Sequence, residues 1–291
     1  MSVKTMKPFE YHAPHSMEGL LEILNEYQER AVIIAGGTDV VPKLKGRVLS
    51  PEHVVDISGI QELSYLDYDE KEGLKIGAAL TLKQLEAAEV VKEKYPALYQ
   101  GCSSIASTQI RNAATIVGNI CNAVPSADSA PSLLVLGAKV KIVSSERERL
   151  VPIEEFFTGV CKTVLKKNEV VTELQIPVPE KESRSVYSSH TARRALDLAM
   201  VGVAVSGSVE NGVCKEVKIG LGAVAVTPKR AYEAEKLLAG KTLTKELIDE
   251  AADCACTNDC SPITDMRATS EYRREMVKVL TRNGLREIAG V

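Results

Sequence analysis

The segment at residues 35–39 (AGGTD) has the residue types of a backbone turn that binds an anion. It follows the apolar run at residues 31–34 (AVII), which predicts a buried strand. The chain must turn sharply at Gly36 and Gly37, where the absence of a Cβ lets the backbone close on a ligand. Consecutive N–H groups in such a turn form an anion-binding nest. The segment is therefore a candidate phosphate site, although a glycine pair followed by threonine also occurs in ordinary turns.

A second segment runs from Thr115 through Gly118 to Asp128 and belongs to a stretch rich in hydroxyl and amide side chains. Burying so many polar groups is costly unless each finds a partner, and a ligand with many hydroxyls and phosphates would supply those partners. Asp128 adds a carboxylate suited to accept hydrogen bonds from ribose or ribityl hydroxyls. The alternative is an exposed loop in which Asn and Ser form turns. The polar residues are Ser103, Ser104, Ser107, Thr108, Gln109, Asn112, Thr115, Asn119, Asn122 and Ser126.

The glycine pattern does not match a Rossmann domain. The dinucleotide fingerprint requires G-x-G-x-x-G between a strand and a helix, and residues 35–42 (AGGTDVVP) lack it. We therefore expect a fold other than a Rossmann domain.

Metal-binding patterns are weak in this chain. Cys254, Cys256 and Cys260 could offer three thiolates to a metal or an iron–sulfur cluster. The favoured interpretation is that they are small, half-buried residues of a helix and its following turn. The four histidines are scattered, and we interpret the neighbours His12 and His15 as loop residues rather than ligands. We expect no metal site in this chain.

Composition limits the possible partners. The chain has 291 residues, 45% of them hydrophobic, which is enough for two or three cores. Its 36 Lys and Arg are outnumbered by 39 Asp and Glu, so nucleic acid is not expected as a partner. Apolar runs such as residues 198–205 are far shorter than the roughly 20 residues that span a bilayer. Residues 1–7 lack a signal-peptide apolar region, so we expect a cytoplasmic protein with reduced cysteines.

The elements around the glycine segments predict α/β character in the first part of the chain. A helix is expected at residues 17–28 with Ser16 as its N-cap. A second helix, from Thr81 to about Glu93, is expected because Thr81 and Gln84 have capping-box spacing. A short helix is predicted at residues 131–136. Strands are predicted at residues 31–35, 53–57, 74–80, 139–144 and 170–178.

The last third of the chain predicts an α+β domain. The polar, proline-led segment at residues 179–185 is the best linker candidate. Strands at residues 198–209 and 213–226 flank Asn211 and Gly212, a pair typical of a tight hairpin. Helices are expected at residues 229–238, 245–256 and 269–288. A hairpin sheet backed by helices is an α+β arrangement.

These segments together resemble the FAD-binding subunit or domain of the molybdenum-containing hydroxylases, the group of xanthine dehydrogenase, aerobic carbon monoxide dehydrogenase and nicotinate dehydrogenase. The resemblance covers nearly the whole chain, and residues 115–128 are its most specific part. The other matching segments are residues 9–14 (FEYHAP), 35–39 (AGGTD), 109–112 (QIRN), 193–199 (RRALDLA) and 265–273 (DMRATSEYR).

The resemblance implies an α+β protein with an α/β-like N-terminal part. An FAD-binding domain of the non-Rossmann type would span residues 1–178, with two subdomains split near residue 58. A smaller α+β domain with an antiparallel sheet and helices would span residues 179–291. The first glycine loop would hold the pyrophosphate, and the second segment the rest of the cofactor. The residues implied to bind FAD are Ile33, Ile34, Ala35, Gly36, Gly37, Thr38, Asp39, Val40, Ile105, Thr115, Ile116, Val117, Gly118, Asn119, Asp128 and Val171.

The activity implied by the resemblance is electron transfer. A molybdenum-cofactor subunit would hydroxylate the substrate, an iron–sulfur subunit would carry [2Fe–2S] clusters, and FAD would pass electrons to an acceptor such as NAD(P)+. No catalytic side chain is then needed here. One position departs from the family, since Ser189 stands where relatives often carry lysine in a Tyr-x-Lys pattern.

Two alternatives remain open. The first is a stand-alone FAD-dependent oxidase or reductase. Such an enzyme would need its own acid–base pair, and no candidate pair stands out. The second is a binding module without activity.

Overall fold

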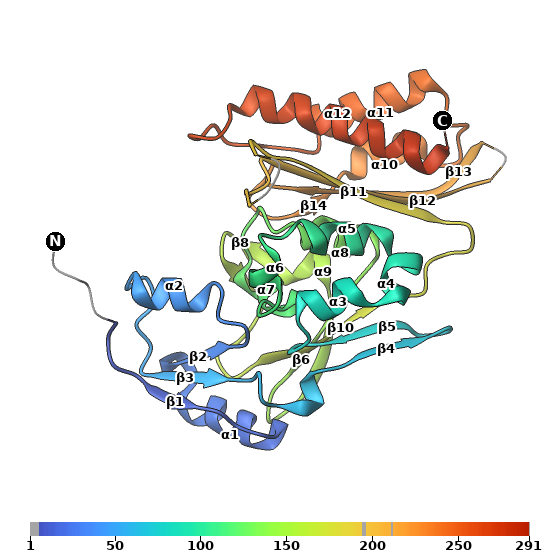
Figure 1. The fold of residues 1–291 in the computed structure, drawn as a ribbon. Helices are drawn as coiled ribbons and strands as arrows, with labels where there is room; N and C mark the ends of the chain where they lie inside the picture. Colours follow the sequence, from blue (N-terminus) through green and yellow to red (C-terminus); the bar gives the residue numbers. More distant parts are fainter. Residues whose placement is uncertain (1–5, 194–195, 211, 291) are drawn as a thin grey trace.

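The computed structural model describes residues 6–193, 196–210 and 212–290. Its elements form three main sheets, of which the first and second lie side by side in the lower part of the view and the third lies above them, with helices between and outside the sheets (Figure 1). The mixture of antiparallel sheets and helices confirms the α+β class expected from the sequence. None of the helices within the described ranges is long and apolar enough to cross a bilayer.

The first sheet is parallel, with strand order β1-β3-β2. Helix α1 begins after Ser16, whose side chain accepts a hydrogen bond from the Gly19 N–H, so the predicted N-cap is confirmed. The predicted strand–helix alternation holds in this part of the chain. Its elements are β1 (Glu10–His12), α1 (Met17–Tyr27), η1 (Gln28–Arg30), β2 (Ala31–Ile34), α2 (Val40–Lys45) and β3 (His53–Asp56).

The second sheet is antiparallel, with strand order β4-β5-β10-β6-β7. The α/β character expected for the first part of the chain therefore ends after the first sheet, because β4 and β5 pair as an antiparallel hairpin. Strand β4 was not predicted from the sequence. The strands are β4 (Leu66–Asp69), β5 (Gly73–Gly77), β6 (Lys139–Val143), β7 (Glu148–Pro152) and β10 (Val170–Ile176), and the short elements beside them are η2 (Gln61–Leu63), α9 (Ile153–Phe156), β8 (Phe157–Gly159) and β9 (Lys162–Thr163).

Short helices connect the strands of this second sheet. The capping box at Thr81 is confirmed, since both of its hydrogen bonds to Gln84 are present. The single helix expected to reach Glu93 is wrong, because Ala88 takes an extended conformation with ψ of 120° and separates two helices. The helices are α3 (Leu82–Ala87), α4 (Glu89–Lys94), α5 (Pro96–Ser104), α6 (Thr108–Arg111), α7 (Ile116–Asn122) and α8 (Ser129–Val135).

The third sheet is antiparallel, with strand order β11-β12-β13-β14. The predicted hairpin between β12 and β13 is present, with Gly212 at a positive φ of 78°, whereas Asn211 lies outside the described residues. The helix expected from Lys229 begins three residues later, because Lys229 and Arg230 form β14. The elements are β11 (Arg184–His190), β12 (Val201–Glu210), β13 (Val213–Gly222), β14 (Lys229–Arg230), α10 (Tyr232–Leu238), α11 (Lys245–Thr257) and α12 (Ser270–Ala289).

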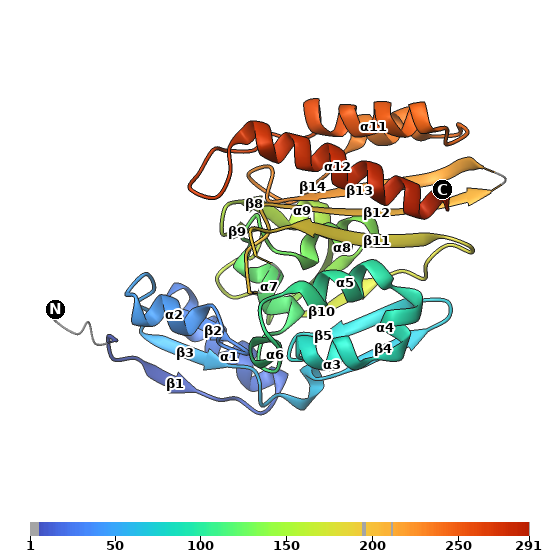
Figure 2. The ribbon, with the colours of Figure 1, turned by 45° about the horizontal axis from the view of Figure 1, so that its top comes forward.

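The hydrophobic residues form two cores. The larger core is built from the first two sheets and helices α1, α3–α5 and α7–α9, with Tyr95 and Phe156 among its fully buried side chains. The second core lies between the third sheet and α10–α12. Helices α5 and α8 contact the other face of the third sheet, so this sheet is covered on both sides (Figure 1). In the turned view, the first sheet again lies on the far side of the molecule from α11 and α12 (Figure 2).

Candidate functional site

The first glycine-containing segment packs against the residues just before the second one. A Cβ on Gly36 would lie 1.8 Å from the carbonyl oxygen of Ala113 and 2.4 Å from its carbonyl carbon. No side chain fits in that space, so the backbone of residues 35–39 packs directly against the residues that precede α7. Gly37 has φ of +69°, in the left-handed region that favours glycine. Both glycines are therefore required by the local geometry.

The glycine loop exposes hydrogen-bond donors. It leaves β2 at Ile34 and enters α2, where the Val41 N–H donates to the Gly37 carbonyl at 2.9 Å. The N–H groups of Gly36, Gly37 and Thr38 have no acceptor within the part of the chain that the structure describes. All three residues are partly accessible to solvent. Unpaired N–H groups in a glycine turn fit the phosphates of a nucleotide cofactor.

The start of α7 is held by side-chain and backbone hydrogen bonds. The Thr115 hydroxyl caps the helix by accepting from the Gly118 N–H at 2.9 Å. The Leu82 N–H donates to the Ala114 carbonyl at 2.7 Å, which ties α7 to α3. The Ser129 hydroxyl donates to the Asn119 side chain at 2.6 Å, which fixes its amide. Gly118 itself is exposed at this end of the helix.

A further hydrogen bond joins α2, the helix that follows the glycine loop, to α7, the helix of the second segment. The Lys43 ammonium of α2 donates to the side-chain oxygen of Asn122 in α7. Asn122 was noted in the sequence only as one of many polar residues, and Lys43 was not predicted. No short-range sequence pattern joins two residues so far apart in the chain.

Asp128 is a buried carboxylate with one strong partner. It is only 9% exposed, and the Tyr187 hydroxyl donates to its Oδ1 at 2.5 Å. Burial raises the pKa of Asp128 to about 6, against the opposing effect of the Tyr187 hydrogen bond. Burial and the neighbouring carboxylate also raise the pKa of Tyr187 well above its ordinary value. At neutral pH the phenol therefore keeps its proton while Asp128 is mostly ionised, with its second oxygen available to another donor.

Asp128 lines a cavity of about 460 Å³ between α5, α6 and the end of β11. Many of the hydroxyl and amide residues noted in the sequence converge here. Ser103 Oγ is buried without a hydrogen-bond partner among the described residues, which marks it as a group that a polar ligand could satisfy. The described lining residues are Ser103, Ser104, Ala106, Ser107, Thr108, Gln109, Arg111, Asp128, Ser189, Thr191, Arg193, Leu196 and Asp197.

Ser189 lies in this cavity with Asp128. The cavity wall is also held by Arg111, which donates to the Ile105 carbonyl at 2.9 Å and forms an ion pair with Glu86 at 3.2 Å. Ile105, one of the residues implied to bind the cofactor, is thereby fixed at the end of α5.

Three of the implied cofactor residues belong to the core. Val171 of β10 is 2% exposed and faces Ile142 of β6 in the second sheet. Ile116 and Val117 lie on the buried side of α7. The structure places these side chains behind the site, where they support it.

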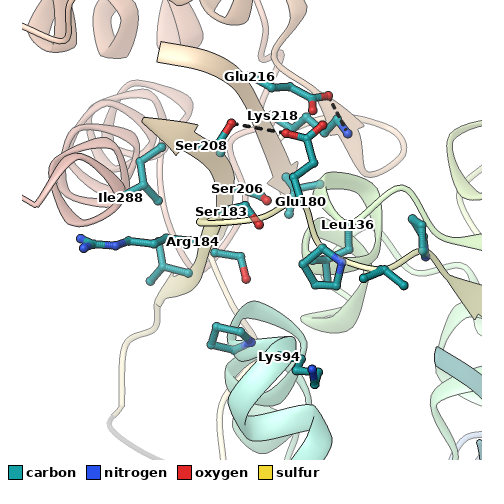
Figure 3. A pocket seen from close by; sticks show the side chains of 18 of the residues that line it. Lys94, Leu136, Glu180, Ser183, Arg184, Ser206, Ser208, Glu216, Lys218 and Ile288 are labelled. Atoms are coloured by element: carbon teal, nitrogen blue, oxygen red, sulfur yellow. Dashed lines mark hydrogen bonds and ion pairs between the residues drawn. The ribbon is translucent and has the colours of Figure 1, made fainter. Parts of the chain in front are cut away.

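A larger cavity of about 620 Å³ lies elsewhere, between α4, α5 and the third sheet (Figure 3). None of the residues implied to bind FAD lines it. Figure 3 shows Ser208 directed toward Glu180, and Lys218 paired with Glu216 at 2.8 Å. A hydrogen bond with Glu216 is the largest factor raising the pKa of Glu180.

The cysteine cluster has ordinary helix contacts. Cys254 and Cys256 lie in α11 and Cys260 in the segment after it, as the favoured interpretation predicted. The Cys256 thiol donates to the Asp253 carbonyl at 3.2 Å, and the Cys260 thiol to the Cys256 carbonyl at 3.1 Å. Within the described ranges, the three sulfur atoms are not close enough together to share an ion.

Comparisons with known proteins cover almost the entire chain. Residues 7–179 match the family model described as FAD binding domain in molybdopterin dehydrogenase, and residues 187–288 match the CO dehydrogenase flavoprotein C-terminal domain. The glyceraldehyde dehydrogenase medium chain of Sulfolobus acidocaldarius is 34% identical over 97% of this chain and 98% of that protein. The xanthine dehydrogenase FAD-binding subunit of Escherichia coli O157:H7 is 34% identical over 95% of this chain and 94% of that protein. The CO dehydrogenase structure from Oligotropha carboxidovorans has a TM-score of 0.93 at 31% identity, covering 98% of this chain and 99% of that one.

Proposed function

The chain belongs to the family of FAD-binding subunits of molybdenum-containing hydroxylases, and from this premise we propose that it holds FAD between the residue 35–39 loop, the start of α7 and the Asp128 cavity. Its role is to pass electrons from the [2Fe–2S] clusters of a partner subunit to a soluble acceptor such as NAD(P)+. The observation that carries the proposal is the contact between Gly36 and Ala113, which brings the first glycine segment against the residues that lead into the second.

The phosphates of FAD would be bound by backbone groups. The N–H groups of Gly36, Gly37 and Thr38 are unpaired within the described chain and offer three donors to a pyrophosphate. The Gly36–Ala113 contact sets the backbone of this loop against the residues that precede α7. A backbone cradle of this kind needs no cationic side chain.

The polyol part of the cofactor would be bound by the cavity. Asp128 presents an ionised carboxylate oxygen that can accept from a hydroxyl group. Ser103 Oγ, which has no partner among the described residues, can donate to or accept from the same ligand. When bound, the flavin supplies the redox chemistry, so no side chain of this chain is needed as a nucleophile or general base.

The names of the relatives support a place in a multi-subunit complex, since they are called medium chain or FAD-binding subunit. We therefore propose as partners an iron–sulfur subunit and a molybdenum-cofactor subunit. We further propose that residues 1–178 form the FAD-binding domain, split near residue 58, and that residues 179–291 form the C-terminal domain. The positions of the three sheets and the ranges of the two family matches support this division. The expected compartment is the cytoplasm.

The test is native purification of the tagged chain, followed by an absorbance spectrum from 300 to 700 nm, a gel, and iron and molybdenum analysis. Flavin bands with two further chains, iron and molybdenum are expected. A flavin-containing chain that purifies alone and turns over a substrate would replace the subunit role with a stand-alone oxidase or reductase. A colourless chain that cannot take up added FAD would overturn the proposal.

The acceptor needs a separate experiment on the purified complex. After reduction with substrate or dithionite under nitrogen, the complex is mixed with NAD+, NADP+ or a soluble quinone, and reoxidation of the flavin is followed near 450 nm. Fast reoxidation by a pyridine nucleotide is expected. Reoxidation by the quinone alone would refute the nucleotide as acceptor.

A further inference from the structure

Three potential metal ligands meet at the start of the first sheet. Glu10 and His12 lie on β1, and His53 is the first residue of the neighbouring strand β3. His12 Nε2 lies 3.0 Å from His53 Nδ1, Glu10 Oε2 lies 3.5 Å from His53 Nδ1, and Glu10 Oε1 lies 3.9 Å from His12 Nε2. Within the described chain, this is the one group of three or more such residues whose ligand atoms all lie within 4.8 Å of one another.

These separations match those of donor atoms around one small cation. Zinc–nitrogen and zinc–oxygen bonds of about 2.0–2.2 Å in a tetrahedral site place neighbouring donors about 3.3 Å apart. The three measured separations bracket that value. Two imidazoles and one carboxylate are also a ligand set that zinc uses in proteins.

The register of the two strands creates the cluster. Glu10 pairs with His53 across the parallel ladder, and His12 lies two residues further along β1, so it points to the same face as Glu10. The expectation that His12 is a loop residue is therefore wrong, because Glu10–His12 forms a strand.

The imidazoles are packed in fixed orientations. The Tyr27 ring, at the end of α1, stacks on His53 with 3.7 Å between centroids and 16° between planes. It also contacts the tilted ring of His12 at 5.4 Å. The side chains of His12 and His53 are only 15% and 10% exposed, whereas Glu10 is 64% exposed. The cluster thus has two buried ligands on one side and a side open to solvent.

We propose that Glu10, His12 and His53 bind a zinc ion, with a water molecule completing the tetrahedron. One of the two facing imidazole nitrogens carries the proton of the His12–His53 hydrogen bond, and that proton moves to the other nitrogen of the same ring when the metal binds. The ion joins β1, an edge strand of only three residues, to the central strand β3.

The proposed zinc site is separate from the FAD site. His53 begins β3, while the glycine loop follows Ile34, which pairs with Asp56 at the other end of the same strand. At about 3.3 Å per residue, the two sites lie roughly 10 Å apart along the strand direction. Zinc binding can therefore be measured whether or not flavin is present.

The test uses the full chain after dialysis against a chelator. Zinc is titrated in competition with a chromophoric chelator, for the wild type and for Glu10→Gln, His12→Gln and His53→Gln. The matched control is His15→Gln, which removes an exposed histidine of the same segment that lies outside the cluster. All variants keep the seven cysteines, so zinc bound by thiols contributes equally to each.

Because loss of even an outer-shell partner weakens metal sites about 10–100-fold, each cluster variant is expected to bind zinc at least about tenfold more weakly. The control should match the wild type. Equal zinc affinity in the wild type and all three variants would overturn the proposal.

Glu10→Gln distinguishes loss of zinc binding from loss of folding, because the exposed side chain of Glu10 contributes little to packing. Crystals of the wild type grown with zinc give a second measurement. An anomalous peak at the zinc edge between the three side chains is expected, and a peak only elsewhere would overturn the proposal.

Discussion

Replacing Asp128 by Asn should stabilise the chain while weakening FAD binding. Asn has nearly the same shape as Asp, and its side-chain oxygen can still accept the hydrogen bond from Tyr187. What the substitution removes is a negative charge that is buried at neutral pH. A carboxylate whose charge weakens the fold but strengthens FAD binding serves binding rather than stability. Measuring both quantities on Asp128→Asn therefore distinguishes the two roles.

The size of the stabilisation follows from the pKa of Asp128. It is about 6 in the folded chain and 3.8 ordinarily, so the folded state holds the proton more tightly. The contribution of Asp128 to the free energy of unfolding is fully present below pH 3.8 and is lost as the pH rises to about 6. At about 1.4 kcal/mol per pH unit, the loss is about 1.6 kcal/mol at pH 5 and about 3 kcal/mol at pH 8.

The assay is urea unfolding of the flavin-free chain, followed by circular dichroism at pH 5 and pH 8. Asp128→Asn should exceed the wild type by about 3 kcal/mol at pH 8 and by about half of that at pH 5. The control is Asp39→Asn, an exposed carboxylate of the glycine loop, for which a change within about 0.5 kcal/mol is expected.

FAD affinity is measured on the same proteins by quenching of flavin fluorescence. A hydrogen bond to a charged group contributes about 1.5–3 kcal/mol, so Asp128→Asn should raise the Kd for FAD about 10–100-fold at pH 8. A variant that is less stable than the wild type at pH 8, or equally stabilised at both pH values, would refute the burial argument. Unchanged FAD affinity would refute the binding role of Asp128.

Three other substitutions give direct tests. Gly36→Ala places a methyl group 1.8 Å from the Ala113 carbonyl oxygen, so the two glycine segments must separate, and the purified protein should lose its flavin absorbance at 450 nm. Arg273→Met leaves a buried and a partly buried carbonyl group without their donor and should lower stability in urea by about 3 kcal/mol, whereas Arg267→Met, at a half-exposed side chain, should have little effect. Ser189→Lys adds a positive charge to the Asp128 cavity and should raise the midpoint potential of bound flavin in a spectroelectrochemical titration; an unchanged potential would place the flavin ring elsewhere.

The parts of the fold that could be predicted from sequence depend on short-range signals. Ser16 and the Thr81–Gln84 pair mark helix starts because their side chains bond to backbone groups three residues away. The β12–β13 hairpin was predictable because two valine-rich runs flank a two-residue turn. The Gly36–Gly37 loop was found because it follows an apolar strand.

The parts that could not be predicted depend on contacts between distant residues. Tyr187 is the partner of Asp128 only because β11 packs against α5 and α8, which nothing near Tyr187 in the sequence reveals. His12 was assigned to a loop because a three-residue strand next to Pro14 is too short to show alternation. The polar stretch at residues 103–128 hid two helices, α6 and α7, because they are short and bury only one and three residues, respectively.

The contact between Gly36 and Ala113, together with the Tyr187–Asp128 bond, has a consequence for biosynthesis. The ribosome makes the phosphate loop early, but the residues that complete the site follow up to about 150 residues later. At about 5–20 residues per second, the glycine loop waits roughly 8–30 s for Tyr187 to be made. A nascent chain that ends before β11 therefore lacks part of the proposed flavin site, and we expect cofactor loading to be a late event in the maturation of this chain.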